Sequence, residues 1–170
     1  MGDAVIVRRL DALDAAALDD LADILVAVVA AGASVGFLPP LGLEAARAYW
    51  EGVCRPGVVL LVAERGGRIV GTGQLDLAMR PNGRRRAEVC KVLVHPEQQG
   101  RGIGRAVMQA LEVEARADGR RLLHLDTDAD APSNRLYRAM GYQEVGTIPA
   151  WAIGADGELH GTTFYYKALD

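Results

Sequence analysis

Cysteine, aromatic residues and long apolar runs are all scarce in this 170-residue chain. Its two cysteines, Cys54 and Cys90, lie far apart without the spacing of a metal site, and nothing resembles a disulfide framework. Residues 21–31 are apolar but fall well short of a membrane span, and no signal peptide is visible. We therefore expect a cytoplasmic protein without membrane association. Because only 5% of the residues are aromatic, the core must consist mostly of Ala, Val and Leu.

The balance of charge argues against one further class of function. The formal net charge is −3 and the isoelectric point is about 5.6, so the chain lacks the basic excess of a general nucleic-acid-binding protein. The sequence contains no internal repeats, low-complexity runs or linkers. Its length suits a sizeable core, and we expect residues 1–170 to form a single domain.

One stretch, residues 88–119, predicts a strand, a glycine-rich loop and an amphipathic helix in direct succession. Residues 88–95 are rich in Val and Leu and end at His95-Pro96, because proline cannot extend a strand ladder. The loop Gln99-Gly100-Arg101-Gly102-Ile103-Gly104 follows, and a helical pattern then runs to Asp118-Gly119. Such a loop brings free backbone N–H groups and the positive end of the helix dipole to one point. The sequence therefore predicts an anion-binding site.

The spacing of the glycines narrows the choice of anion. A dinucleotide fingerprint fails because Arg105 stands where the third glycine is required, and no Gly-Lys-Ser/Thr follows to make a P-loop. The residues Gln99, Gly102 and Gly104 instead fit the pattern Q/R-x-x-G-x-G/A, which resembles the acetyl-CoA signature of the GNAT superfamily of N-acetyltransferases. The resemblance implies acetyl-CoA as cosubstrate, its pyrophosphate bound by Gln99, Gly100, Arg101, Gly102, Ile103, Gly104 and Arg105.

The remaining segments predict an α/β (α+β) fold. We expect helices over residues 14–31 and 43–53, and strands over residues 5–9, 58–63, 69–77, 142–148 and 162–167. The strand Leu122–Asp126 should run parallel to the strand of Glu88 across a right-handed crossover. Ser133 should cap a short helix that ends near Met140. The resemblance adds a GNAT-like mixed central sheet with a splayed parallel strand pair and helices on both faces.

Later residues extend the resemblance over most of the chain. Asn134 and Tyr137, with the following Met140-Gly141-Tyr142, resemble the late GNAT motif in which an Asn and a Tyr lie beside the CoA thiol. Within the family, residues 32–169 are most similar to acetyltransferases of the tabtoxin-resistance type, through segments 32–37, 82–83, 86–89, 122–127 and 165–167. That similarity implies a small-molecule amine as acceptor and leaves the identity of the amine open.

Acetyl transfer from a thioester to an amine needs a polarised carbonyl and a proton for the departing sulfur. If the two parallel strands splay, the pantetheine could lie along the backbone of Val92, Leu93 and Val94, where an N–H group would polarise the carbonyl. The resemblance implies Tyr137 as the acid that protonates the sulfur. Asn134, one helical turn earlier, could hold the pantetheine amide.

The general base has several candidates. Glu88 stands on the central strand and Asp126 at the carboxyl end of the next parallel strand, where open sheets bind ligands. The resemblance favours these two carboxylates as catalytic residues, and His124, on the same strand face as Asp126, is a rival base. A carboxylate is a weak base for an ammonium, so transfer should use water or a raised pKa. Cys90 lacks a histidine partner set by spacing and fits a buried structural cysteine better than a nucleophile.

A run of aspartates also invites comparison with a calcium loop. Asp126, Asp128 and Asp130 begin like an EF-hand, but Ala131 and Tyr137 stand where Gly and a bidentate Glu are required. We therefore expect no metal. The same negative charges would attract a cationic amine, which favours an amino substrate.

Two other functions stay open at this point. Acetylation of a protein or peptide amine would need an open groove, and nothing in the linear sequence separates it from a small-molecule acceptor. A catalytically idle domain that binds acetyl-CoA as a sensor is disfavoured by the presence of a tyrosine and two carboxylates in the expected places. Residues 32–41 either cover the acceptor pocket or simply connect two helices. A homodimer is expected only by analogy with the family.

Overall fold

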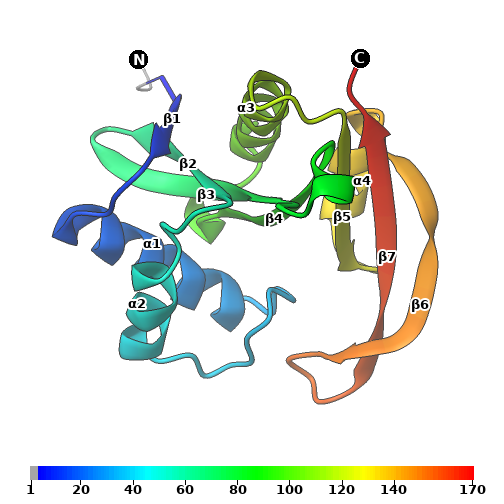
Figure 1. The fold of residues 1–170 in the computed structure, drawn as a ribbon. Coiled ribbons are helices and arrows are strands. Elements are labelled where there is room, and N and C mark those ends of the chain that lie inside the picture. Colours follow the sequence, from blue (N-terminus) through cyan, green and yellow to red (C-terminus); the bar gives the residue numbers. More distant parts are fainter. Residues whose placement is uncertain (1–3) are drawn as a thin grey trace.

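The computed structural model describes residues 4–170, in which seven strands form one mixed sheet and four α-helices flank it (Figure 1). The elements in chain order are β1 (Ile6–Leu10), α1 (Ala15–Ala30), α2 (Leu43–Glu51), β2 (Val58–Arg65), β3 (Arg68–Leu77), the 3₁₀ turn η1 (Pro81–Gly83), β4 (Arg86–Val94), the 3₁₀ turn η2 (Pro96–Gln98), α3 (Ile103–Ala117), β5 (Leu122–Asp128), α4 (Ser133–Ala139), β6 (Gln143–Ile153) and β7 (Leu159–Ala168). Each helix and strand expected from the sequence has its counterpart here, and β6 and β7 extend beyond the expected bounds.

The sheet has the strand order β1-β2-β3-β4-β5-β7-β6. Within residues 4–170, β4 and β5 are the one parallel pair, and the other neighbouring strands are antiparallel. In Figure 1 the strands β2–β4 and the strands β5–β7 run in clearly different directions, so the sheet opens between β4 and β5. The predicted parallel pair inside a mixed sheet is therefore confirmed.

Helices cover both faces of the sheet, as the sequence predicts. One apolar core lies between the sheet and α3, where Val107, Met108 and Leu111 are fully buried. The other lies between the sheet and the helices α1 and α2, around Leu21 and Trp50. Both cores consist mostly of aliphatic side chains, which accounts for the low aromatic content. No helix within residues 4–170 combines the length and the apolar character that crossing a bilayer requires.

The start of α4 differs from the expectation. Pro132, not Ser133, is the N-cap residue, and Ser133 is already the first helical residue. The hydroxyl of Ser133 lies 2.8 Å from the hydroxyl of Thr127 on β5 and does not cap the helix. A serine before a short helix matches the usual capping pattern, but here the partner on β5 engages its side chain.

Candidate active site

The parallel strands β4 and β5 pair over three residues only. Their shared register ends at Glu88 opposite His124, although β4 continues to Val94 and β5 to Asp128. Beyond that rung the facing edges of the two strands have separated. A ligand with an extended, amide-bearing chain could therefore bind along the free edge of β4 as an added strand would.

A bulge in β4 lies just beyond the last paired rung. Lys91 and Val92 together face the single residue Gly73 of β3. Lys91 has a φ of 51°, in the left-handed region that non-glycine residues seldom adopt. After the bulge, Leu93 belongs to the core beside α1 and α2, whereas Val92 and Val94 pack toward α3. The bulge thus separates the part of β4 that pairs with β5 from the part that does not.

The glycine-rich loop has the geometry of an anion site. Gly100 and Gly102 have φ angles of 73° and 79°, and α3 begins directly after Gly102. Within residues 4–170, the backbone N–H groups of residues 100–105 donate no hydrogen bond to the rest of the chain. Arg101 and Arg105 are exposed beside them. The side chain of Gln99 is engaged within the protein, since its Nε2 donates to the carbonyl of Val94 at 3.1 Å.

The predicted acid and the predicted base lie on opposite faces of the opened sheet. Tyr137, on α4, is buried with the core on the α3 side, whereas Asp126 follows Leu125 on β5 and points to the α1 and α2 side. Burial and, to a lesser extent, the nearby charge of Asp126 raise the pKa of Tyr137 to about 12. Partial burial also raises the pKa of Asp126, which the charges of Lys91 and His124 partly offset. The two groups are therefore close enough for the charge of Asp126 to affect Tyr137.

Glu88 and Cys90 lie on the same side of β4 as the α1–α2 layer. Both are half-buried, and Glu88 forms the last rung with His124. Burial, with the charge of Glu88, raises the pKa of Cys90 to about 11. A thiol with so high a pKa is protonated at neutral pH, which supports a structural cysteine over a nucleophile.

Asn134 organises the loop between β5 and α4. Its Nδ2 lies 2.8–3.3 Å from three backbone carbonyls, those of Asp128, Ala129 and Ala131. Its Oδ1 accepts a 2.7 Å hydrogen bond from the buried hydroxyl of Tyr165. The side chain is therefore fully engaged within the protein and fixes the end of β5 relative to α4.

A pocket of about 200 Å³ lies between the α1–α2 connection and the turn that joins β6 to β7. Gly32, Phe37 and Leu38 form one wall, and Asp128, Gly154 and His160 contribute to the other. The segment of residues 32–41 thus lines a pocket next to the end of β5.

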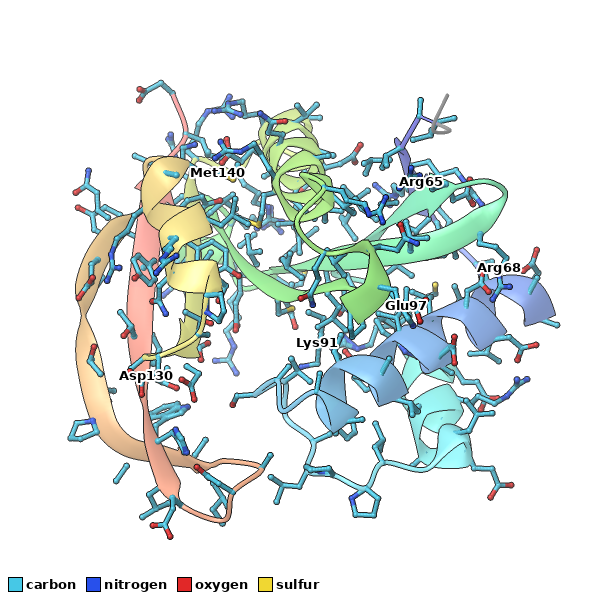
Figure 2. The ribbon with its side chains drawn as sticks, turned by 180° about the vertical axis from the view of Figure 1, so that it is seen from behind. Arg65, Arg68, Lys91, Glu97, Asp130 and Met140 are labelled. Carbon is cyan, nitrogen blue, oxygen red and sulfur yellow. The ribbon has the colours of Figure 1, made fainter. Side chains whose placement is uncertain are left out.

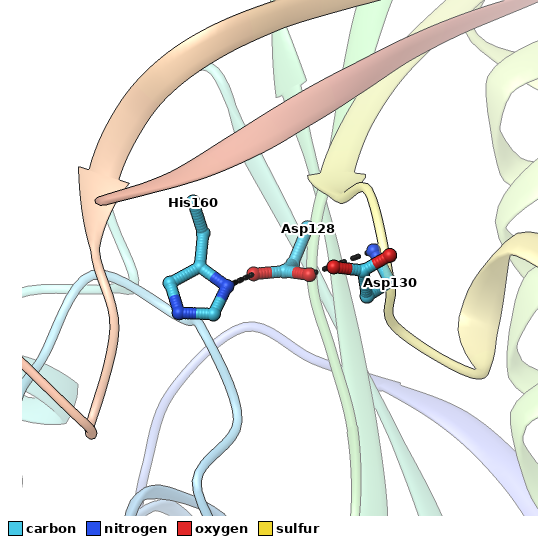
Figure 3. Close-up of side chains that lie close together, drawn as sticks. All are labelled: Asp128, Asp130 and His160. Carbon is cyan, nitrogen blue, oxygen red and sulfur yellow. Dashed lines mark hydrogen bonds and ion pairs between the residues drawn. The ribbon is translucent and has the colours of Figure 1, made fainter. Parts of the chain in front are cut away.

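Acidic side chains gather beside this pocket (Figure 3). His160 Nδ1 lies 3.6 Å from Asp128 Oδ2, and its Nε2 lies 2.9 Å from Asp156 Oδ2. The backbone N–H of Asp130 donates to Asp128 Oδ1 at 2.9 Å. One ligand-type atom each from Asp128, Asp130 and His160 lies within 4.8 Å of the others. Because His160 and a backbone N–H already engage Asp128, we assign the group an electrostatic effect on the pocket.

Sequence reasoning missed two residues of this region, Lys91 and His160. Lys91 lies on the β4 side of the site, across from Asp130 beside β5 (Figure 2). Neither the left-handed backbone of Lys91 nor its contact with the ring of Tyr49 leaves a signal in the linear sequence. His160 joins the acidic group only because β7 pairs with the end of β5. No local spacing could have indicated that contact.

The free N–H groups at the start of α3 and the opening between β4 and β5 together suit an elongated anionic ligand. Residues 33–142 match the model of the acetyltransferase (GNAT) family. An N-acetyltransferase from the hisH–hisA intergenic region of Azospirillum brasilense is 36% identical over 125 residues, 72% of this chain and 74% of that protein. The chain therefore belongs to the GNAT family of acetyltransferases, and the family predicted from the sequence is confirmed.

Two further relatives carry information about ligands. The L-methionine sulfoximine/L-methionine sulfone acetyltransferase of Salmonella typhimurium is 28% identical over 124 residues, which is 72% of each chain. The solved structure of yncA from Salmonella typhimurium, an acetyltransferase with its cofactor acetyl-CoA, superposes with a TM-score of 0.80 at 25% identity. That superposition covers 99% of this chain and 95% of yncA. These likenesses agree with an acetyl-CoA-dependent acetyltransferase.

Proposed function

We propose that the protein transfers an acetyl group from acetyl-CoA directly to the primary amine of a small molecule. The observation that carries the proposal is the end of β4–β5 pairing at Glu88, because it opens the sheet between a buried tyrosine and a carboxylate of raised pKa. The small volume of the pocket, about 200 Å³, favours a small acceptor over a protein segment, which would need a long groove. Residues 1–170 would form one domain that carries both binding sites.

The donor fits the free backbone groups of the site. The N–H groups of residues 100–105, with Arg101 and Arg105 beside them, suit a pyrophosphate at the positive end of α3. The free edge of β4 at Val92, Leu93 and Val94 suits the amide-bearing pantetheine. Acetyl-CoA supplies an acetyl group already activated as a thioester. Because Asn134 is fully engaged within the protein, we assign it to positioning the β5–α4 loop.

Proton transfer would use one group on each face of the opening. Asp126, with its raised pKa, is the stronger candidate to accept the proton of the amine, and Glu88 is the alternative. Tyr137 Oη is protonated at neutral pH and would hold a proton for the departing sulfur. A phenol with a pKa of about 12 is a weaker acid than an ordinary thiol. The departing sulfur would share this water-poor environment, which raises its basicity as well, so Tyr137 Oη could still donate its proton to the thiolate.

The chemical class of the acceptor is inferred from the substrates named for similar proteins. The relative from Salmonella acts on methionine sulfoximine and methionine sulfone, and another relative, MnaT of Escherichia coli, is an L-amino acid N-acyltransferase at 27% identity over 60% of this chain. We propose an amino-acid-like compound, including antibiotics and toxins of that type. The narrower resemblance to the tabtoxin-resistance type stays a prediction about the acceptor.

Release of free CoA thiol from acetyl-CoA by the purified protein tests the proposal. The assay compares no acceptor with panels of amino acids, other small amines, β-lactam-bearing dipeptide analogues and basic peptides. Release that depends on one class of small amine is the expected result. Release with peptides only would replace the proposed acceptor with a peptide amine. Binding of acetyl-CoA by calorimetry without release for any acceptor would contradict the transferase and favour a sensor domain.

A further inference from the structure

The side chain of Lys91 projects from the β4 bulge toward the acceptor side of the sheet. Its Nζ lies 5.7 Å from the centroid of the Tyr49 ring on α2. A Cβ built on Gly36, in the α1–α2 connection, would lie 3.7 Å from the same nitrogen. Figure 2 shows Lys91 on the side opposite Asp130. The ammonium group is thus held beside the segment that lines the pocket, away from the glycine loop.

This ammonium lacks the ion pair that a half-buried lysine usually has. The chain has two lysines, and the other, Lys167, lies 2.8 Å from a carboxylate oxygen of Glu112. Within residues 4–170, no carboxylate oxygen lies within 4.0 Å of Lys91 Nζ. Its contact is instead the face of Tyr49, whose hydroxyl accepts a hydrogen bond from Gln74 at 3.2 Å. A cation with no carboxylate within ion-pair distance can receive an anion from a ligand.

The backbone of Lys91 also points to function. A left-handed φ is unfavourable for a lysine and persists only where its surroundings impose it. Such residues gather at ligand sites, and this one lies three residues beyond the last rung that joins β4 to β5. The geometry places one cation on β4 opposite the carboxylates of β5. An acceptor with an amine and a carboxylate would match both charges.

We propose that Lys91 binds the carboxylate of an amino-acid acceptor while Asp126 faces its amine. This inference rests on the proposed acetyltransferase function and adds the residue that selects the acceptor. The donor's phosphates would not satisfy Lys91, because the free N–H groups for them lie at the start of α3 and the ammonium points toward α1 and α2. The edge-to-face rings of Phe37 and Tyr49, 5.5 Å apart, supply an apolar wall for the acceptor's side chain.

The test compares an L-amino acid with its own carboxamide as acceptors, at a pH above the pKa of both amines. The variants are Lys91→Met, the conservative Lys91→Arg, and the control Arg8→Met, which removes a cation on the far edge strand β1. Because a charge-assisted hydrogen bond is involved, Lys91→Met should lower kcat/KM for the acid by roughly ten- to a hundredfold, mostly through KM. It should leave the amide nearly unchanged. Lys91→Arg should retain most of the preference for the acid, and Arg8→Met all of it.

Several outcomes would overturn the inference while leaving the acetyltransferase intact. One is a wild-type enzyme that acetylates the amide as well as the acid, a comparison that needs no variant. Another is an equal loss for acid and amide in Lys91→Met, which would show a structural role only. Absence of acetyl transfer to every amine would instead contradict the proposed function, and the inference with it. Circular dichroism and melting curves confirm that each variant is folded before its kinetics are compared.

Discussion

Gly102 offers a test that separates ligand binding from backbone strain. Its φ is 79°, and a Cβ added there would meet no other atom within 4 Å. Alanine would therefore cost only the left-handed conformation, about 1–2 kcal/mol of folding free energy. For a chain of this length that lowers the melting temperature by about 2–4 °C per kcal/mol. The methyl group would also be added inside the loop whose N–H groups, those of residues 100–105, are free and where we place the pyrophosphate.

The structure provides a matched control at the other end of the same helix. Gly119 has a φ of 77°, and a Cβ there would also meet nothing within 4 Å. Gly102→Ala and Gly119→Ala should thus melt at similar temperatures, measured by circular dichroism. Only Gly102→Ala should weaken acetyl-CoA binding in calorimetry, by roughly ten- to a hundredfold if one charge-assisted hydrogen bond is lost. Equal affinities for the two variants would refute the anion site at the start of α3.

Three further predictions concern titratable side chains. Tyr137→Phe should lower kcat by roughly a hundredfold or more and change the Kd for acetyl-CoA little, and full turnover would exclude the tyrosine as the acid. Because the pKa of Asp126 is raised and its carboxylate form is the base, kcat/KM should fall as the pH drops through that pKa, above the ordinary value of 3.8. In Asp126→Asn this fall of kcat/KM at low pH should disappear. If it disappears in Glu88→Gln instead, Glu88 is the base. The hydrogen bond to Asp156 raises the pKa of His160, so the stabilisation that His160 provides should be complete below pH 6.5 and disappear as the pH rises through the folded-state pKa. Melting curves of wild type and His160→Gln should therefore converge at high pH.

The strand, loop and helix of residues 88–119 could be predicted because their signals are local. Proline ends the strand, the glycines adopt positive φ, and the apolar face of the helix repeats every three to four residues. The position of Asp126 followed from the parallel arrangement of two strands. These features are sufficient to propose a donor site and one candidate base from the sequence alone.

The rest of the site depends on contacts that no local pattern encodes. The bulge at Lys91 inserts one extra residue and reverses the alternation of β4, whereas the sequence pattern suggests one continuous strand. Ser133 fails as a cap because Thr127, on another element, engages its hydroxyl. The pairing of His160 with Asp128 requires β7 to lie against β5. Each of these is a choice between partners that only the folded chain brings together.

Lys91 also suggests that one residue serves both ligands, with its backbone shaping the donor site and its side chain binding the acceptor. Its backbone forms the bulge just beyond the last rung with β5, while its side chain carries the cation toward Tyr49 and the α1–α2 connection. Glycine adopts a φ of 51° freely, so Lys91→Gly should keep the bulge and relieve about 1 kcal/mol of strain. We expect this variant to bind acetyl-CoA like the wild type in calorimetry, and to lose the preference for an acid acceptor. Weaker acetyl-CoA binding in a folded Lys91→Gly protein would mean that the lysine side chain itself holds the strand in place, and the two roles would then not be separable.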